Sequence, residues 1–302
     1  MFFKSRRESK ELIIFSLLNT RMDLSQNERQ QYCNLKKGYE GERRFDSLTE
    51  CLSDKFLILN DLQLESNSSL FQMDTLLITQ DILIPCEIKN YEGDYIYEND
   101  NFYKCTTKRE ITNPLHQLNR IETLLRQFIQ KHGYPFDIKG FLTFINPKFF
   151  LYQAPQNEKM IFWPQWGNFL KYLHEQPSRL NKHHHKLAKF LVESHHHDPP
   201  YSKLPPYQYE LLRKGILCPK CFSFMSNHTQ RKVICEQCGQ SETMESAVVR
   251  SVEEFKILFP EKEISTDQVY DWCKIIQSKR IIGRILKKNF KMLGYGQWTF
   301  YE

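Results

Sequence analysis

Three residues in the first third of the chain have side chains suited to metal-assisted hydrolysis. Asp74 is followed thirteen positions later by Glu87, and Lys89 stands two positions beyond Glu87. Mg²⁺ favours sites with one or two carboxylates, retained waters and substrate phosphates. The lysine would orient or help deprotonate an attacking water and stabilise developing negative charge. Taken alone, this spacing more often belongs to an edge strand with solvated charges, so the surrounding sequence has to decide.

An antiparallel hairpin is the element that would bring these side chains together. Two apolar runs rich in β-branched residues, 71–79 and 82–90, are separated by a short turn, which is the pattern of a β-hairpin. Because strand side chains alternate between faces, Glu87 and Lys89 project from one face about 7 Å apart. Pairing of the two runs brings Asp74 beside them.

Motifs on both sides of the hairpin complete an ordered set. Upstream, a G-x-x-G-E motif that ends at Glu42 opens a helical stretch, and downstream an N-P-x-x-Q motif that ends at Gln117 opens another. The hairpin itself carries E-x-K-N-x-x-G, from Glu87 to Gly93. In this order the motifs resemble the nuclease-related domain family, NERD, a branch of the restriction-endonuclease-like superfamily, over residues 36–150.

The resemblance implies an α/β core with a mixed sheet flanked by helices, and a metal-dependent nuclease. Asp74 and Glu87, with the backbone carbonyl of Ile88, are expected to coordinate Mg²⁺ or Mn²⁺ on the central strands. By the same resemblance Glu42, on the first helix, would bind a second metal ion or its water shell. Gln117, on the later helix, would help to position substrate or metal.

The sequence departs from the family pattern at two places. Thr75 stands where a histidine commonly follows the aspartate, and Pro85-Cys86 replaces the usual aliphatic pair before the glutamate. Proline inside a strand removes a ladder donor and belongs at an edge or a bulge. The alternative left open is therefore a non-catalytic or regulated nucleic-acid-binding protein with a vestigial nuclease core.

Two C-x-x-C motifs predict a metal site in the last third of the chain. Each motif forms a tight turn whose two thiolates face one point, and thirteen residues between the motifs fit the two hairpins of a Cys₄ zinc ribbon. Four cysteine ligands leave no open coordination position, so the predicted zinc is structural. The residues 232–234 read as the strand that leads into the second motif. The predicted zinc ligands are Cys218, Cys221, Cys235 and Cys238.

Composition is that of a soluble globular protein with about two domains. The 302 residues carry a formal net charge of +6, which is compatible with nucleic acid as a partner. Nine cysteines without an export signal indicate a cytoplasmic location. The apolar stretch 12–18 is too short to cross a membrane and predicts a helix that docks on the catalytic core.

Residues 177–210 form a His/Pro-rich helix and linker in this reading. His183-His184-His185 and His195-His196-His197 flank an apolar-periodic segment. Consecutive residues of a helix point in different directions and cannot chelate one ion together. A solvated, partly protonated helix with frayed ends is therefore favoured over a metal site, and the prolines between 199 and 206 form a stiff connector.

The C-terminal segment 247–302 predicts two short helices, a longer helix over 279–293 and a final strand over 297–301, an order compatible with a winged helix-turn-helix. The longer helix is basic and contains no acid, which is typical of a helix that contacts phosphates. A solvated basic face on a helical packing unit is the alternative, with protein contacts in place of DNA. The candidate nucleic-acid-binding residues are Lys279, Arg280, Arg284, Lys287, Lys288 and Lys291.

The leading hypothesis is a metal-dependent nuclease that hydrolyses nucleic acid, DNA being favoured, with the ribbon and the basic domain aiding substrate binding. Its expected catalytic residues are Glu42, Asp74, Glu87, Lys89 and Gln117. The expected division is 1–35 (helical extension), 36–176 (nuclease core), 177–210 (helix and linker), 211–246 (zinc ribbon) and 247–302 (winged-helix-like domain).

Overall fold

A computed structural model describes residues 2–196, 204–229, 231–296 and 299–302 of the chain. The chain divides into two compact units. The first comprises Met1–Glu8 with Asn34–Tyr201, and the second Ser9–Cys33 with Ser202–Glu302. Among the described residues, no helix has the length and apolarity needed to cross a membrane.

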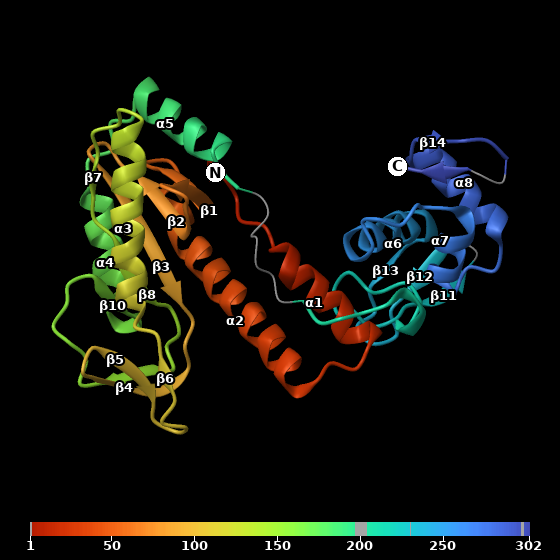
Figure 1. Ribbon diagram of the computed structural model, residues 1–302, viewed down its shortest axis with the longest axis horizontal. Coiled ribbons are helices and arrows are strands. Elements are labelled where there is room, and N and C mark those ends of the chain that lie inside the picture. Colours follow the sequence, from red (N-terminus) through yellow and green to blue (C-terminus); the bar gives the residue numbers. More distant parts are fainter. Residues whose placement is uncertain (1, 197–203, 230, 297–298) are drawn as a thin grey trace. The chain divides into compact units, whose positions relative to one another are not determined.

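The first unit is built on a six-stranded mixed sheet, which agrees with the predicted α/β fold (Figure 1). Its first three strands pair antiparallel in chain order, and the remaining three run parallel to their neighbours. The order is β1-β2-β3-β8-β10, with β7 also paired to β3. The strands are β1 (Leu57–Ser66), β2 (Ser69–Ile78), β3 (Ile82–Lys89), β7 (Asp137–Ile138), β8 (Phe141–Phe144) and β10 (Met160–Phe162).

The proline of β3 lies in an internal strand, so its expected position at an edge or bulge is wrong. Pro85 pairs with Leu76 of β2. Bonded and non-bonded pairs alternate in an antiparallel ladder. Counting from the hydrogen bond of the Thr79 N–H to the Ile82 carbonyl, the Leu76–Pro85 pair is non-bonded. The proline nitrogen therefore points away from β2, toward the other side of β3. On that side β7 ends opposite Leu83 and β8 begins opposite Cys86, so neither strand pairs with the proline. No ladder bond is lost, and the predicted hairpin forms.

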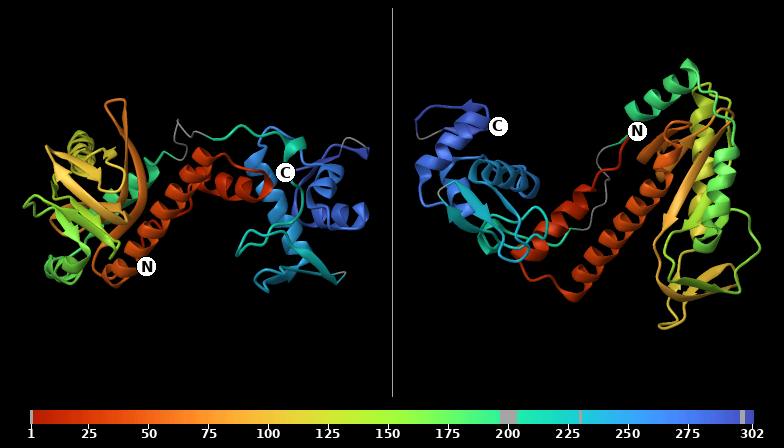
Figure 2. Two further views of the ribbon diagram at one scale, coloured as in Figure 1. Left: turned by 90° about the horizontal axis from the view of Figure 1, so that it is seen from below. Right: turned by 180° about the vertical axis from the view of Figure 1, so that it is seen from behind.

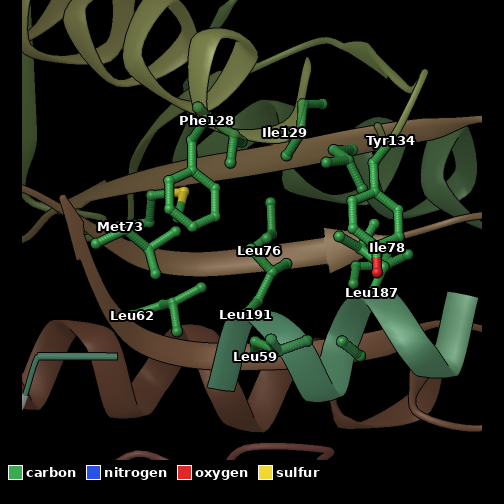
Figure 3. Packing of buried hydrophobic residues seen from close by; sticks show 14 of the residues in the cluster. Leu59, Leu62, Met73, Leu76, Ile78, Phe128, Ile129, Tyr134, Leu187 and Leu191 are labelled. Atoms are coloured by element: carbon green, nitrogen blue, oxygen red, sulfur yellow. The ribbon is translucent and has the colours of Figure 1, made fainter. Parts of the chain in front are cut away.

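Helices lie on both faces of the sheet (Figure 2), and apolar side chains of the strands and helices pack together between them. One face packs against α3 and α5, as the side chains of Figure 3 show. The other packs against α2 and α4. A smaller sheet, ordered β6-β5-β4-β9, follows the end of β3. These elements are α2 (Gln26–Thr49), α3 (Pro114–Lys131), α4 (Trp166–Glu175), α5 (Lys182–Glu193), β4 (Gly93–Glu98), β5 (Asn101–Lys104), β6 (Glu110–Ile111) and β9 (Phe149–Tyr152).

The histidine-rich helix α5 is a packed element, and the expectation of a solvated helix is wrong for its inner face. His184 is buried, and its ring nitrogens lie 2.8 Å from the Gln80 carbonyl and 2.9 Å from Oδ1 of Asn181. His183 stacks on Phe136. His197 and the prolines at 199 and 200 lie outside the described residues. His184 thus takes part in the capping box of Asn181 and connects the start of this helix to the β2–β3 turn.

In its described residues the second unit combines a small antiparallel sheet with four helices and the first turns of α2. The sheet order is β11-β12-β13, and a two-stranded hairpin, β14-β15, follows the last helix. Its elements are α1 (Lys10–Arg21), β11 (Ser226–Thr229), β12 (Lys232–Ile234), β13 (Ser241–Thr243), α6 (Met244–Leu258), α7 (Thr266–Cys273), α8 (Lys279–Asn289), β14 (Met292–Leu293) and β15 (Phe300–Tyr301).

Helix α1 belongs to this second unit, so the expectation that it docks on the catalytic core is wrong. Arg21, at its end, is fully buried and donates to the carbonyls of Arg213 and Gly215 at 3.0 and 3.1 Å. Its guanidinium also pairs with Glu254 at 3.3 Å and lies 3.9 Å from the ring centre of Trp272. The buried arginine joins α1 to α6 and α7.

The basic helix is shorter than predicted. Helix α8 ends at Asn289, because Phe290 is extended at φ −129° and ψ 153°, and Met292–Leu293 already forms β14. Part of the predicted final strand, Gln297 and Trp298, lies outside the described residues, and β15 covers Phe300–Tyr301.

Candidate active site

The β2–β3 hairpin places Asp74 beside the two charged residues of β3. The register pairs Thr75 with Cys86, which sets Asp74 opposite Glu87. The carboxylate of Asp74 accepts a 2.7 Å hydrogen bond from the backbone N–H of Ile88 through Oδ2. This bond fixes one oxygen of Asp74 and leaves the other for a ligand.

Glu87, Lys89 and Gln117 form a connected cluster at the end of β3. The Lys89 ammonium donates to Oε1 of Glu87 at 2.6 Å and to Oε1 of Gln117 at 3.0 Å. Gln117 arrives from the first turn of α3, which Asn113 caps by accepting the Leu115 N–H at 2.9 Å. The structure thus brings the residues of the hairpin motif and the N-P-x-x-Q motif together.

Glu42 reaches the same region from α2, which approaches the end of β3 closely. A Cβ at Gly41 would lie 2.4 Å from the Cβ of Asn90, so only glycine allows this approach, whereas Gly38 has nothing within 4 Å. The Asn90 side-chain amide also donates to the Lys37 carbonyl at 2.7 Å. Of the two glycines in the G-x-x-G-E motif, the second is the one that the packing requires.

Arg6 is the residue of this region that the sequence did not single out. Its side chain is 3 % exposed and donates to Oε2 of Glu42 at 2.7 Å. It holds both oxygens of Asp46, at 2.9 and 3.0 Å. It also donates to the backbone carbonyl of Asp74 at 2.8 Å and to the hydroxyl of Thr75 at 3.0 Å. No periodicity or motif marks Arg6, because every one of these partners is far away in the sequence.

Burial governs the protonation of the acids. Burial and the charge of Asp74 raise the pKa of Glu87 to about 8 and the pKa of Glu42 to about 7. Burial raises the pKa of Asp74 as well. Burial alone would lower the pKa of Lys89, but the charges of Glu87 and Asp74 outweigh it and raise that pKa above its ordinary value. Lys89 is therefore a cation, and burial together with the negative charge of Asp74 favours the protonated forms of Glu42 and Glu87.

The donor atoms fit a hard divalent cation. Glu87 is 1 % exposed, and its Oε2 is buried without a hydrogen-bond partner among the described residues. Such an atom costs free energy unless a ligand satisfies it. Glu42, Asp74 and Glu87 are not all within 4.8 Å of one another, unlike the four cysteines considered below. Two carboxylates and a backbone carbonyl with retained water match the preference of Mg²⁺.

Mn²⁺ affinity at this site is expected to rise between about pH 6 and about pH 8. Carboxyl groups must lose their protons to act as ligands, and the raised pKa values of Glu42 and Glu87, about 7 and about 8, lie in this window. Each proton displaced strengthens binding by up to about tenfold per pH unit. Titration of free Mn²⁺ by electron paramagnetic resonance measures the affinity. A flat profile in wild type would contradict the expectation, and Glu87→Gln should show little Mn²⁺ binding at any pH.

The four cysteines of the second unit converge as predicted. All four sulfur atoms lie within 4.8 Å of one another. The two halves have the same local geometry: the N–H of Phe222 donates to the Cys218 carbonyl, and that of Gly239 to the Cys235 carbonyl. Both donors have positive φ, 61° and 73°, which closes each turn tightly. A hydrogen bond from the Ser223 backbone lowers the pKa of the Cys221 thiol to about 6. The cluster is a candidate Cys₄ metal site, and β12 leads into its second half as expected.

The first unit therefore combines a mixed α/β sheet with two acids and a lysine on its central hairpin, as the predicted nuclease-related fold requires. Residues 37–145 match the family model described as the nuclease-related domain, NERD. The predicted family resemblance is confirmed for this segment. No curated protein and no solved structure matches the chain.

Proposed function

We propose that this protein is a divalent-metal-dependent nuclease that hydrolyses phosphodiester bonds, DNA being the favoured substrate. The observation that supports it best is one oxygen of Glu87, next to Asp74 and Lys89 in the matched nuclease-related segment, which is buried without a hydrogen-bond partner in the described part of the chain. A solvated edge strand, the alternative for the acid-lysine spacing, would not bury this carboxylate.

Asp74 and Glu87, with the carbonyl of Ile88, would hold the cation. A bound divalent ion supplies a nucleophilic water near neutral pH and neutralises charge on the phosphate. Lys89, kept protonated by its acid neighbours, stabilises negative charge that develops on the phosphoryl oxygens. Gln117 fixes the Lys89 ammonium from the side of α3, and Glu42 orders water or a second ion.

The second unit is proposed to aid DNA binding. Helices α6, α7 and α8 with the β14–β15 hairpin have the order of a winged helix-turn-helix, and an isolated bridge joins Ile264 to Tyr301 of the hairpin. The Cys₄ cluster would hold a structural Zn²⁺, since four thiolates close the tetrahedron. A cytoplasmic location stays a prediction.

The cations of α8 fall into two groups. Lys279 pairs with Asp267 at 2.7 Å, and Lys288 pairs with Glu245 at 2.8 Å, so acids from neighbouring helices engage two of the six predicted contacts. Arg280, Arg284 and Lys287 are exposed and recur at the i, i+4, i+7 spacing of one helix face. This exposed stripe is the part of α8 best placed to contact phosphates.

Cleavage with and without divalent metal tests the proposed function. Purified full-length protein is incubated with supercoiled plasmid, single-stranded DNA and RNA oligonucleotides in Mg²⁺ or Mn²⁺. Cleavage that EDTA abolishes and that Glu87→Gln eliminates is the expected result. Cleavage that persists in Glu87→Gln would point to a contaminating enzyme or to another site. Absence of cleavage on every substrate would favour the vestigial core.

Charge reversal on the exposed stripe should weaken DNA binding without regard to sequence. Arg284→Glu with Lys287→Glu removes two phosphate contacts, and each contact contributes about −0.9 to the slope of log affinity against log salt. The slope is therefore expected to flatten by about two units. Fluorescence anisotropy with unrelated duplexes at several salt concentrations measures it. Lys279→Gln with Lys288→Gln, at ion-paired positions, is the matched control and should change the slope less. Equal slopes in wild type and the stripe variant would make α8 a solvated face.

A further inference from the structure

The chain's N-terminal segment pairs with the edge strand β1 of the first unit through an isolated bridge. The backbone N–H groups of Phe3 and Lys4 donate to the Ile58 carbonyl at 2.9 and 3.2 Å, and the Asn60 N–H donates to the Lys4 carbonyl at 2.9 Å. Lys4 forms a parallel bridge with Leu59 of β1. This segment precedes the matched nuclease-related residues 37–145. It brings Arg6 against the C-terminal half of α2 and the middle of β2.

The guanidinium of Arg6 uses all its nitrogens on two elements that carry site acids. On α2 it contacts Glu42 and, through a two-pronged pair, Asp46. On β2 it contacts the Asp74 carbonyl and the Thr75 hydroxyl. Thr75 is in turn held by its 3.0 Å donation to Oδ1 of Asn60 on β1. The planar guanidinium holds its donors in a fixed geometry and can bond both elements at once, whereas the ammonium of a lysine is a point charge on a flexible side chain.

Arg6 occupies one carboxylate oxygen of Glu42 and contacts Asp74 through its backbone. It contacts only the backbone carbonyl of Asp74, whose carboxylate bonds to Ile88 instead. It contacts Oε2 of Glu42, and no hydrogen bond to the other oxygen of Glu42 is seen in the described part of the chain. Its ion pairs are with Glu42 and Asp46, and no hydrogen bond or ion pair between Arg6 and Glu87 is seen among the described residues.

We propose that Arg6 is a positioning residue of the nuclease site, which sets Glu42 on α2 against the strand of Asp74 so that the acids meet a divalent cation in one geometry. The inference rests on the proposed function and adds the N-terminal segment to the site. Outer partners of metal ligands typically change metal affinity by about 10- to 100-fold when removed, and Arg6 stands in that relation to Glu42 and Asp74.

Mn²⁺ binding to the full-length, zinc-loaded protein tests the proposal without reliance on turnover. Wild type, Arg6→Gln, Arg6→Lys and Glu87→Gln are titrated with Mn²⁺ alone, and free Mn²⁺ is read by electron paramagnetic resonance. Arg6→Gln should lose affinity by about tenfold or more. Arg6→Lys keeps the positive charge without the planar guanidinium, so its Mn²⁺ affinity should lie between those of Arg6→Gln and wild type. In cleavage assays Arg6→Gln should lower kcat more than it raises KM, because the substrate contacts are unchanged.

Two matched controls separate positioning from other roles of the segment. Arg7→Gln removes the neighbouring, exposed positive charge and should bind Mn²⁺ as wild type does. Lys4→Gln loosens the same segment, since Lys4 donates to the carbonyls of Asn60 and Asp61 at 2.7 and 2.5 Å, but touches no site acid. Losses as large in Lys4→Gln as in Arg6→Gln would reduce Arg6 to an anchor of the segment and overturn the proposal.

The remaining outcomes are also decisive. If Arg6→Gln or Arg6→Lys binds Mn²⁺ as tightly as wild type, the positioning role of Arg6 is overturned, while the proposed nuclease function stands. Absence of Mn²⁺ binding in wild type, equal to Glu87→Gln, overturns the proposed function together with the inference. If Arg6→Gln fails to fold, Asp46→Asn removes the main anchor of the guanidinium and keeps Arg6. Unchanged affinity in that variant then overturns the proposal.

Discussion

Replacing Asp74 by Asn or Lys89 by Ala is expected to lower the rate of phosphodiester cleavage by about three orders of magnitude or more. Asp74 and Glu87 are the proposed ligands of a cation that supplies the nucleophile, and Lys89 supplies the charge opposite the reacting phosphate. Groups that act as one unit have non-additive effects, so the double variant should be scarcely slower than the worse single variant. Single-turnover cleavage of plasmid in Mg²⁺ measures the rates.

Both variants are expected to fold, which makes the rates interpretable. In Asp74→Asn the amide oxygen can still accept the Ile88 N–H that the carboxylate accepts at 2.7 Å. In Lys89→Ala the buried Glu87 loses its cation, but its raised pKa allows it to take up a proton. Asp81→Ala, on the exposed β2–β3 turn, and Lys131→Ala, exposed at the end of α3, are the matched controls. Wild-type rates in folded Asp74→Asn and Lys89→Ala would move the active site elsewhere.

Removal of metal from the Cys₄ cluster is expected to unfold the ribbon and destabilise the second unit. Structural zinc sites in isolated fingers contribute about 10–16 kcal/mol of apparent binding free energy, which appears as folding free energy. Cys218 and Cys235 are fully buried, so a free site would leave their thiols facing one another without a ligand. Elemental analysis should find about one zinc per chain. Cys218→Ser should abolish most of it.

Thermal unfolding with and without a chelator tests whether the metal stabilises the second unit. The transition of the second unit should fall sharply on chelation, while that of the first unit should hold, because all four cysteines belong to the second unit. Cys33→Ser, an exposed cysteine of the same unit outside the cluster, should keep zinc and stability. An unchanged transition in a zinc-free sample would show that the helices alone stabilise this unit.

The hairpin of the candidate site could be predicted because its information is local. Two apolar runs on either side of a two-residue turn predict the antiparallel pairing, and the register of that pairing sets Asp74 opposite Glu87 without any distant contact. The cysteine turns are local in the same sense, since each needs only four residues and one residue of positive φ. The first strand, β1, was not predicted, although it pairs with β2 along its whole length.

Packing partners, in contrast, were decided by the tertiary structure. The apolar face of α1 predicts burial, but burial is non-directional and does not name the surface that covers it. That surface is in the second unit, where Arg21 stacks on Trp272. The acids that engage Lys279 and Lys288 come from other helices, so a helix without acids in its own sequence is partly neutralised.

Arg6 shows the same division between sequence and structure within the candidate site itself. Its partners Glu42, Asp46, Asp74 and Thr75 lie 36 to 69 positions away along the chain. The residues that carry the chemistry were determined by the sequence, since a carboxylate or a thiolate has its reactivity wherever it stands. Their orientation depends on hydrogen bonds between elements that only folding brings into contact. The role of Arg6, which joins α2 to β2, could therefore be recognised only in the tertiary structure.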